Sequence, residues 1–327
     1  MRNVAVLSHI ADIDGVGAAA LVRLRYKIPL GNIFFAGHDV AEVSFAEAGI
    51  RRLCKGGILL FVTDLTPEDQ TAPIYERIVN SVNRIGGRVV FLDHHPWSDR
   101  IVKRIAKKCF IAVFGENRQM CATELVKKYT GLDTRFVREF ARVVHHADFY
   151  IQLSEKRHSR LVDDYAMHFA GVNMSKSFSK RLRDLRHVAE VISSGRFEDE
   201  AISKGAAKFK RLNESRIAKM LESVQIISNK IGVGFTKQVD STEACMAIIH
   251  SERVPMSVVI NLDHMKGSIR STGPDISVLA NAFGGGGHPH ASGFSLDAKR
   301  YNSFRTTHDR QKATEMIARR ARAVGLL

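Results

Sequence analysis

The segment Val89-Val90-Phe91-Leu92-Asp93-His94-His95 joins a short apolar run directly to an acidic residue and two histidines. Apolar runs of this length, rich in β-branched residues, are typical of strands that are buried on both faces of a sheet. Comparable runs at 4–7, 33–36 and 58–62 alternate with segments long enough to form helices. The sequence therefore predicts an α/β fold in which helices wrap a parallel sheet.

Acidic or histidine side chains follow three of these four runs, and a further acidic residue ends a helical pattern at 134–149. The aspartates in these places are Asp12, Asp14, Asp64 and Asp148, and the histidines are His9 and His94. Ligands of open α/β sheets bind at the carboxyl ends of the parallel strands. The clusters can therefore converge on one place although they lie far apart in the sequence.

Carboxylate oxygens and imidazole nitrogens suit Mn²⁺ or Mg²⁺ better than a thiolate-binding metal. A single aspartate after a strand is more often a helix N-cap or a turn residue. Several carboxylates at one sheet edge, however, would repel one another unless cations neutralised them. Two cations about 3.5 to 4 Å apart can hold a hydroxide nucleophile and polarise a phosphoryl oxygen. The pattern predicts phosphoester hydrolysis, with Asp64 as the bridging carboxylate.

Three other side chains near these groups have two interpretations each. His145 and His146 precede Asp148 on the same predicted helix, where they can support the metal residues or interact with the helix dipole. Trp97 can stack on a base, although a lone tryptophan is more often a packing residue, and we favour packing.

The second half of the chain has a different pattern. Residues 153–230 are rich in Lys, Arg, Glu and Ser and show helical stretches, and strand signals return at 245–249, 256–261 and 268–271. We predict a catalytic domain at 1–195, a helical linker at 196–230 and a smaller α/β domain at 231–327.

A glycine-rich segment near the C-terminus has the features of an anion site. Gly284-Gly285-Gly286-Gly287-His288 follows a short helical run and can present successive N–H groups, with the imidazole as a further donor. Upstream, Arg270 offers a bidentate fork for a phosphate. The alternative is a flexible loop beside an ordinary surface arginine.

Charge and composition narrow the class of protein. Forty-nine Lys and Arg against 34 Asp and Glu give a net charge of +15, which favours polyanionic partners. Any one basic cluster can equally be a solvated helix face. The four cysteines are scattered, which favours neither a disulfide framework nor a zinc site. Without a signal-peptide layout or an apolar run of about 18 residues, we expect a cytoplasmic protein with no membrane partner, and homo-oligomerisation is left open.

The tripeptide Asp93-His94-His95 resembles the signature of the DHH phosphoesterases, which include RecJ-type exonucleases, nano-RNases, cyclic-dinucleotide phosphodiesterases and family II pyrophosphatases. The family's other motifs occur in the same order, at His9 to Gly15, at Asp64 and at Ala147-Asp148. Segments 268–271 and 284–288 resemble the substrate-binding domain that accompanies many DHH enzymes, which argues against a pyrophosphatase.

The resemblance implies two Mn²⁺ ions, with Mg²⁺ as the alternative, held by Asp12, Asp14, Asp64, His94 and Asp148. In one common form of the first motif three residues separate the histidine from the first aspartate, whereas two separate them here, so His9 stays an open sixth ligand. The resemblance also implies that His95 contacts the scissile phosphate and that Asp93 orients a histidine. The implied substrate-binding residues are Arg270, Gly285, Gly286, Gly287 and His288.

We therefore predict a parallel-sheet DHH domain and a smaller C-terminal substrate-binding domain with a cleft between them. The expected activity is that of a Mn²⁺-dependent phosphodiesterase or exonuclease, which releases mononucleotides from single-stranded or short oligonucleotides. The alternative is a small-nucleotide phosphodiesterase that acts on cyclic di-AMP or a 3′,5′-bisphosphonucleoside. A catalytically inactive nucleic-acid-binding protein is a third reading, which the complete ligand set disfavours.

Overall fold

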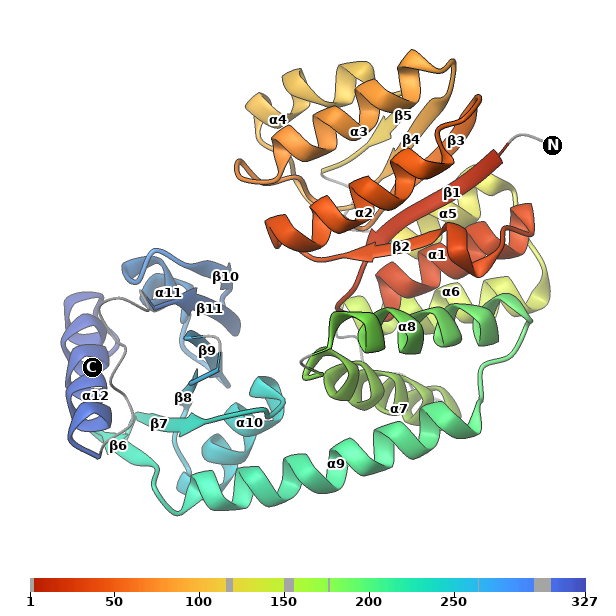
Figure 1. Cartoon of the computed structure of the whole chain (residues 1–327). Coiled ribbons are helices and arrows are strands. Elements are labelled where there is room, and N and C mark those ends of the chain that lie inside the picture. The colour runs from red at the N-terminus through yellow and green to blue at the C-terminus, as the bar shows by residue number, and fades with distance from the viewer. Residues whose placement is uncertain (1–2, 116–119, 150–155, 176, 264, 297–306) are drawn as a thin grey trace. The chain divides into compact units, whose positions relative to one another are not determined.

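The computed structural model describes residues 3–115, 120–149, 156–175, 177–263, 265–296 and 307–327. The chain divides into two compact units, Met1–Ala207 and Lys208–Leu327 (Figure 1). Helix α9 (Glu200–Leu221) contains the point of division and occupies most of the stretch predicted as a linker, which also contains strand β6 (Gln225–Ile227). Within the described part of the chain, none of the helices is long and apolar enough to span a bilayer.

Five parallel strands form the sheet of the first unit. In spatial order they are β2 (Ile33–Ala36), β1 (Asn3–His9), β3 (Ile58–Thr63), β4 (Arg88–Leu92) and β5 (Ile111–Val113). The predicted parallel-sheet α/β fold is confirmed. In this order the connections from β1 and β3 run to opposite sides, so the carboxyl ends of these two strands border the switch point where open α/β sheets bind ligands.

Helices cover both faces of this sheet (Figure 1). One face shares an apolar core with α1 (Ile13–Tyr26), α5 (Ala122–Thr130), α6 (Arg135–Asp148), α7 (Lys156–Asn173) and α8 (Phe178–Ser193). The other face packs against α2 (Val40–Leu53), α3 (Ala72–Arg84) and α4 (Asp99–Arg104). Two short 3₁₀ segments, η1 (Leu30–Asn32) and η2 (Ala106–Lys108), complete the unit. Because the sheet is buried on both faces, its central strands read as continuous apolar runs.

The second unit contains a mixed sheet in the order β10 (Gly286–His288), β11 (Ala291–Ser295), β9 (Lys266–Ser271), β8 (Met256–Asn261), β7 (Ile231–Thr236) and β6. Strands β7 and β8 pair in parallel, and the other neighbours pair antiparallel. Helix α10 (Ser241–Glu252) and the end of α9 pack in one apolar cluster, whereas α11 (Ser277–Ala282) and α12 (Thr307–Ala323) belong to another.

The strand predicted at 245–249 is wrong, because these residues lie within α10. Ala244, Cys245, Ile248 and Ile249 are buried, at a spacing that places them on one side of the helix. A short continuous apolar run does not by itself distinguish a buried strand from the buried face of a helix.

Candidate metal centre

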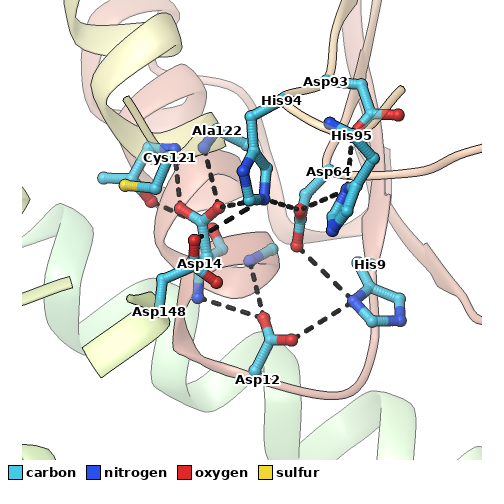
Figure 2. A network of polar contacts seen from close by, with 12 residues as sticks. His9, Asp12, Asp14, Asp64, Asp93, His94, His95, Cys121, Ala122 and Asp148 are labelled. Atoms are coloured by element: carbon cyan, nitrogen blue, oxygen red, sulfur yellow. Dashed lines mark hydrogen bonds and ion pairs between the residues drawn. The ribbon is translucent and has the colours of Figure 1, made fainter. Parts of the chain in front are cut away.

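The carboxyl edge of the parallel sheet brings the predicted aspartates and histidines together (Figure 2). His9 is the last residue of β1, Asp64 follows β3, and Asp148 is the last residue of α6. The loop after β4 supplies the remaining histidines and one buried acid, Asp93, His94 and His95. Three strand ends and one helix end therefore contribute to a single cluster.

Asp64 lies in the middle of the cluster and is almost fully buried. Its Oδ2 is 3.5 Å from Nδ1 of His9, and its Oδ1 is 3.5 Å from Nε2 of His94. The backbone of Asp64 has a φ of 55°, in the left-handed region that aspartate tolerates better than most residues. Its N–H donates to the carbonyl of Leu92 at 3.0 Å, which holds this conformation in place. Strain of this kind persists where the surrounding structure fixes a functional side chain.

Asp14 and Asp148 approach the same nitrogen of His94 as Asp64 does. Their Oδ2 atoms lie 3.8 Å and 3.6 Å from its Nε2. The buried carboxylate of Asp14 also accepts the N–H groups of Ala122 and Thr123, each at 2.7 Å, in the first turn of α5. A helix N-terminus stabilises negative charge, so α5 fixes the orientation of Asp14.

Asp12 has two roles that the sequence presented as alternatives. Its Oδ1 caps α1 by accepting the N–H groups of Asp14 and Gly15, while its Oδ2 lies 3.4 Å from Nδ1 of His9. A Cβ atom on Gly15 would stand 2.5 Å from the carbonyl oxygen of His9, so only glycine permits this close approach. The shorter spacing between His9 and Asp12 thus still brings His9 into the cluster.

Asp93 is fully buried and holds His95. Its Oδ1 lies 2.8 Å from Nδ1 of His95, and its Oδ2 accepts hydrogen bonds from Trp97 Nε1 at 2.7 Å and Thr66 Oγ1 at 2.9 Å. The His95 side chain is 48% exposed, which leaves its Nε2 as the nitrogen available to a substrate. The Trp97 ring is buried against Phe91 and Phe114, so the packing interpretation is confirmed.

His145 is tied to the site indirectly. Its Nδ1 lies 2.8 Å from Oε2 of Glu124, and the same oxygen accepts the N–H of Cys121 at the start of α5. This contact supports the helix terminus that holds Asp14. His145 therefore stabilises the surroundings of a candidate ligand.

Two further polar residues, His38 and Glu68, lie at the rim of this cluster and were not predicted from the sequence. The ring of His38 is 5.4 Å from the ring of His9, and its Nδ1 is 3.4 Å from Oε1 of Glu68. Both side chains are about half exposed. The available signal was a histidine two residues after the predicted strand at 33–36, the one strand to which no polar cluster had been assigned.

Burial and like charge perturb the acids of the cluster. Burial raises the pKa of Asp14 well above its usual value, and the charges of Asp64 and Asp148 raise it further. Burial also raises the pKa of Asp148 to about 6, although His94 opposes the shift. Burial lowers the pKa of His94, but Asp64, Asp14 and Asp148 outweigh this effect and raise it to about 9. The site thus favours added positive charge.

The donor atoms fit divalent metal ions. Three sets of residues each place their ligand atoms within 4.8 Å of one another: His9, Asp12 and Asp64; Asp14, His94 and Asp148; and Asp64, His94 and His95. Asp64 belongs to two of these sets. His94 Nε2 and Asp148 Oδ2 are buried without a hydrogen-bond partner, which a native structure rarely leaves unexplained. Metal coordination would satisfy both atoms.

The second unit contains the predicted substrate-binding residues. Arg270 is partly buried, and its guanidinium donates to the carbonyl of Ile269 at 2.9 Å and to Oγ1 of Thr242 at 2.7 Å. Strand pairing matches His288 with Ala291 and Ala291 with Arg270. Directly paired residues point to the same face of a sheet, so His288 and Arg270 share one face, with their backbones about 10 Å apart.

The glycine-rich segment differs from the expected anion nest. The N–H groups of Gly284 and Gly285 donate to Asn281 and Ala280, so they end helix α11 and the N–H of Gly285 is not free for an anion. Gly286 and Gly287 continue into the exposed strand β10. Gly287 has a φ of 139°, and a Cβ atom there would stand 2.6 Å from the carbonyl oxygen of Ala291, so this position requires glycine.

Comparison with known proteins identifies a family model within the second unit. Residues 223–314 match the family model of the DHHA1 domain. No curated protein sequence matched the chain.

Three solved structures share the fold. An exopolyphosphatase-related protein from Bacteroides fragilis has 13% identity and a TM-score of 0.50, with 99% of this chain and 93% of that chain covered. The pGpG-specific phosphodiesterase PggH from Vibrio cholerae has 12% identity and a TM-score of 0.51, with 97% and 98% covered. RecJ from Thermus thermophilus, solved with Mn²⁺, has 15% identity and a TM-score of 0.51, with 96% and 52% covered, so this chain spans about half of RecJ.

The DHHA1 match covers residues 223–314, and the likeness to these three structures extends over nearly the whole chain and shows a shared fold.

Proposed function

We propose that the protein is a Mn²⁺-dependent phosphodiesterase that releases mononucleotides from the end of single-stranded or short oligonucleotides. The observation that carries this proposal is the position of Asp64, whose two carboxylate oxygens face two different histidines within one buried acidic cluster. A carboxylate placed in this way can bridge two cations. Paired cations are a recurrent device for cleaving phosphodiester bonds.

Different residues of the site would hold the metal ions and contact the phosphate. His9, Asp12 and Asp64 would hold one ion, and Asp14, His94 and Asp148 would hold the other, with Asp64 within reach of both. The bound cations would supply Lewis acidity toward water and the phosphoryl oxygens. In its protonated form His95, whose Nδ1 is held by Asp93, would donate a hydrogen bond from Nε2 to an oxygen of the scissile phosphate.

The second unit would bind another part of the substrate. Arg270 has a planar cation suited to phosphate, and two of its nitrogens are already held by Ile269 and Thr242. His288, Gly286 and Gly287 are exposed on the adjoining edge of the sheet and would add donors. The net charge of +15 favours a substrate with several phosphates over one with a single phosphate.

A second candidate activity is that of a small-nucleotide phosphodiesterase. The fold covers 98% of PggH, a phosphodiesterase specific for the dinucleotide pGpG, but only about half of RecJ. This difference favours a short substrate. Cyclic di-AMP and 3′,5′-bisphosphonucleosides are the alternatives within this class.

Product analysis separates the candidates. Single strands labelled at the 5′ or the 3′ end, from dinucleotides to about 16 nucleotides long, would be incubated with Mn²⁺ beside cyclic di-AMP and a bisphosphonucleoside. We expect mononucleotides to appear from one end of the strands. Hydrolysis of only the cyclic or bisphosphate compounds would support the second candidate, and no hydrolysis of any substrate would contradict both. The Asp64→Asn variant serves as the inactive control.

A further inference from the structure

A groove in the first unit lies outside every motif described above. It has a volume of about 480 Å³ and is lined by Leu30, Phe45, Ser179, Leu182, Arg183, Arg186, His187 and Glu190. Phe45 belongs to α2, and all the others except Leu30 belong to α8. The groove therefore lies beside β2, the edge strand of the parallel sheet.

An exposed aromatic ring stands in this groove. Phe45 is 53% exposed, one of the largest such fractions among the large apolar residues that the structure describes. It meets the ring of Phe178 edge to face at 5.3 Å, and this contact limits its movement. Proteins that bind single strands use partly exposed aromatic rings of this kind as stacking platforms for bases.

Two arginines accompany the ring. The guanidinium of Arg186 donates twice to the carbonyl of Ile33 at the start of β2, at 3.1 Å and 2.9 Å, so its charge has a fixed place. Arg183 lies one turn earlier on α8, and its side chain is 75% exposed. Acidic groups are also present, since Asp184 lies 3.9 Å from Arg183 and Glu190 lines the far end of the groove. Both arginines lie on α8 between Phe178, which contacts Phe45, and Glu190.

The end of the groove nearer Phe45 lies toward the metal centre. Glu42 of α2 accepts the N–H of Gly37 at 2.8 Å and a hydrogen bond from Arg181 of α8 at 2.6 Å. Gly37 precedes His38, whose ring contacts His9. A chain of contacts thus joins the start of α8 to the candidate metal ligands. From Ser179 to Glu190 helix α8 rises roughly 17 Å, which gives room for a few nucleotides.

We propose that this groove binds the part of a single-stranded nucleic acid that extends beyond the scissile phosphate. A base would stack on Phe45, and backbone phosphates would pair with Arg183 and Arg186. This inference rests on the proposed nucleic-acid substrate and adds a binding site for it. A polyanion suits the groove better than a second copy of this chain, because two chains that each carry a net charge of +15 repel one another.

The test measures how affinity depends on strand length in the wild-type protein and in variants of the groove. Affinities of the full chain with Mn²⁺ would be measured by fluorescence anisotropy on phosphorothioate strands, whose linkages resist hydrolysis, from dinucleotides to about 16 nucleotides. The variants are Phe45→Ala and Arg183→Ala. The matched control is Arg100→Ala, since the Arg100 side chain is 72% exposed and lies on α4, on the other face of the sheet.

We expect the wild-type protein and the control to bind the long strand more tightly than the dinucleotide. Phe45→Ala should reduce this gain about 5- to 100-fold. Arg183→Ala should lower the slope of log affinity against log salt by about 0.7. An equal increase in affinity with strand length in all four proteins would overturn the proposal. It would also be overturned if Phe45→Ala differed from wild type only in that a dimer dissociates, as measured by sedimentation. Failure of the proposed function would look different, because strands would bind normally and no substrate would be cleaved.

Discussion

Oδ1 of Asp64 lies 3.5 Å from Nε2 of His94, although the two residues follow different strands of the sheet. The other oxygen of Asp64 faces His9 at the same distance. Parallel strands place their carboxyl ends at one edge, so the fold itself brings these groups together. Asp64 is therefore the residue through which the two halves of the candidate metal centre are connected.

Replacing Asp64 tests this connection. Asp64→Asn keeps the shape of the side chain and removes the charge that a bridging ligand needs, so we expect kcat to fall by at least about 100-fold. The fold should persist, because a like charge leaves an acidic cluster, and circular dichroism would check this. Asp69→Asn, at an exposed position of similar chemistry, is the control. An Asp64→Asn variant with wild-type activity would contradict the assigned role.

Thermal stability should depend on pH and metal together. The raised pKa of Asp148 contributes stability to the metal-free protein. This contribution is fully present below about pH 3.8 and is lost as pH rises through about 6. The raised pKa of His94 makes a second contribution, which is fully present below about pH 6.5 and is lost as pH rises through about 9. Asp12 and Asp93 have lowered pKa values, so their contributions to stability are lost only as the pH falls into a more acidic range.

The metal-free melting temperature should therefore fall between pH 6 and pH 9. Metal ligands must be deprotonated, so the increase in melting temperature on adding Mn²⁺ should be larger at pH 9 than at pH 6. Differential scanning fluorimetry with and without the metal would measure both trends. A metal effect that shrinks as pH rises would contradict this assignment of the charges.

His95 should affect turnover more than metal binding. Its Nδ1 is held by Asp93 and its ring is half exposed, as expected for a group that donates to a phosphate oxygen. We expect His95→Ala to lower kcat by about 100-fold. Mn²⁺ affinity measured by calorimetry should stay near the wild-type value. If one Mn²⁺ is lost instead, His95 is a ligand.

Arg270 should act mainly on substrate binding, and Thr242 should position it. Arg270→Ala is expected to raise KM with a smaller effect on kcat, because it removes a phosphate contact. Thr242→Val removes the hydroxyl that accepts from the guanidinium, so we expect a smaller rise in KM of the same kind. Thr242→Ser retains the hydroxyl and should restore the wild-type value. An unchanged KM in Arg270→Ala would count against this site.

The sequence was most informative where each strand ends. The apolar runs at 4–7, 33–36, 58–62 and 89–92 all lie in strands of the sheet, because buried parallel strands need continuous apolar residues. Since polar groups follow three of these runs, the position of the cluster could be predicted as well. Strand β5 was missed because its three residues are only partly buried and give no such signal.

Other features depend on three-dimensional neighbours that a sequence does not display. Residues 245–249 have the same apolar character in a helix as in a strand, so only their packing separates the two. The N–H of Gly285 ends a helix because Ala280 lies within reach, which glycine content alone does not indicate. The groove beside Phe45 requires α2 and α8 to lie next to each other, and they are far apart in the sequence.

Calorimetric titration of the metal-free protein with Mn²⁺ tests the central claim most directly, when it is combined with the rate of strand hydrolysis at each addition. We predict two ions per chain in the wild-type protein, with activity appearing only as the second ion binds. Asp64→Asn should bind fewer than two ions and remain inactive. Full activity with one ion or none per chain would contradict a two-metal mechanism.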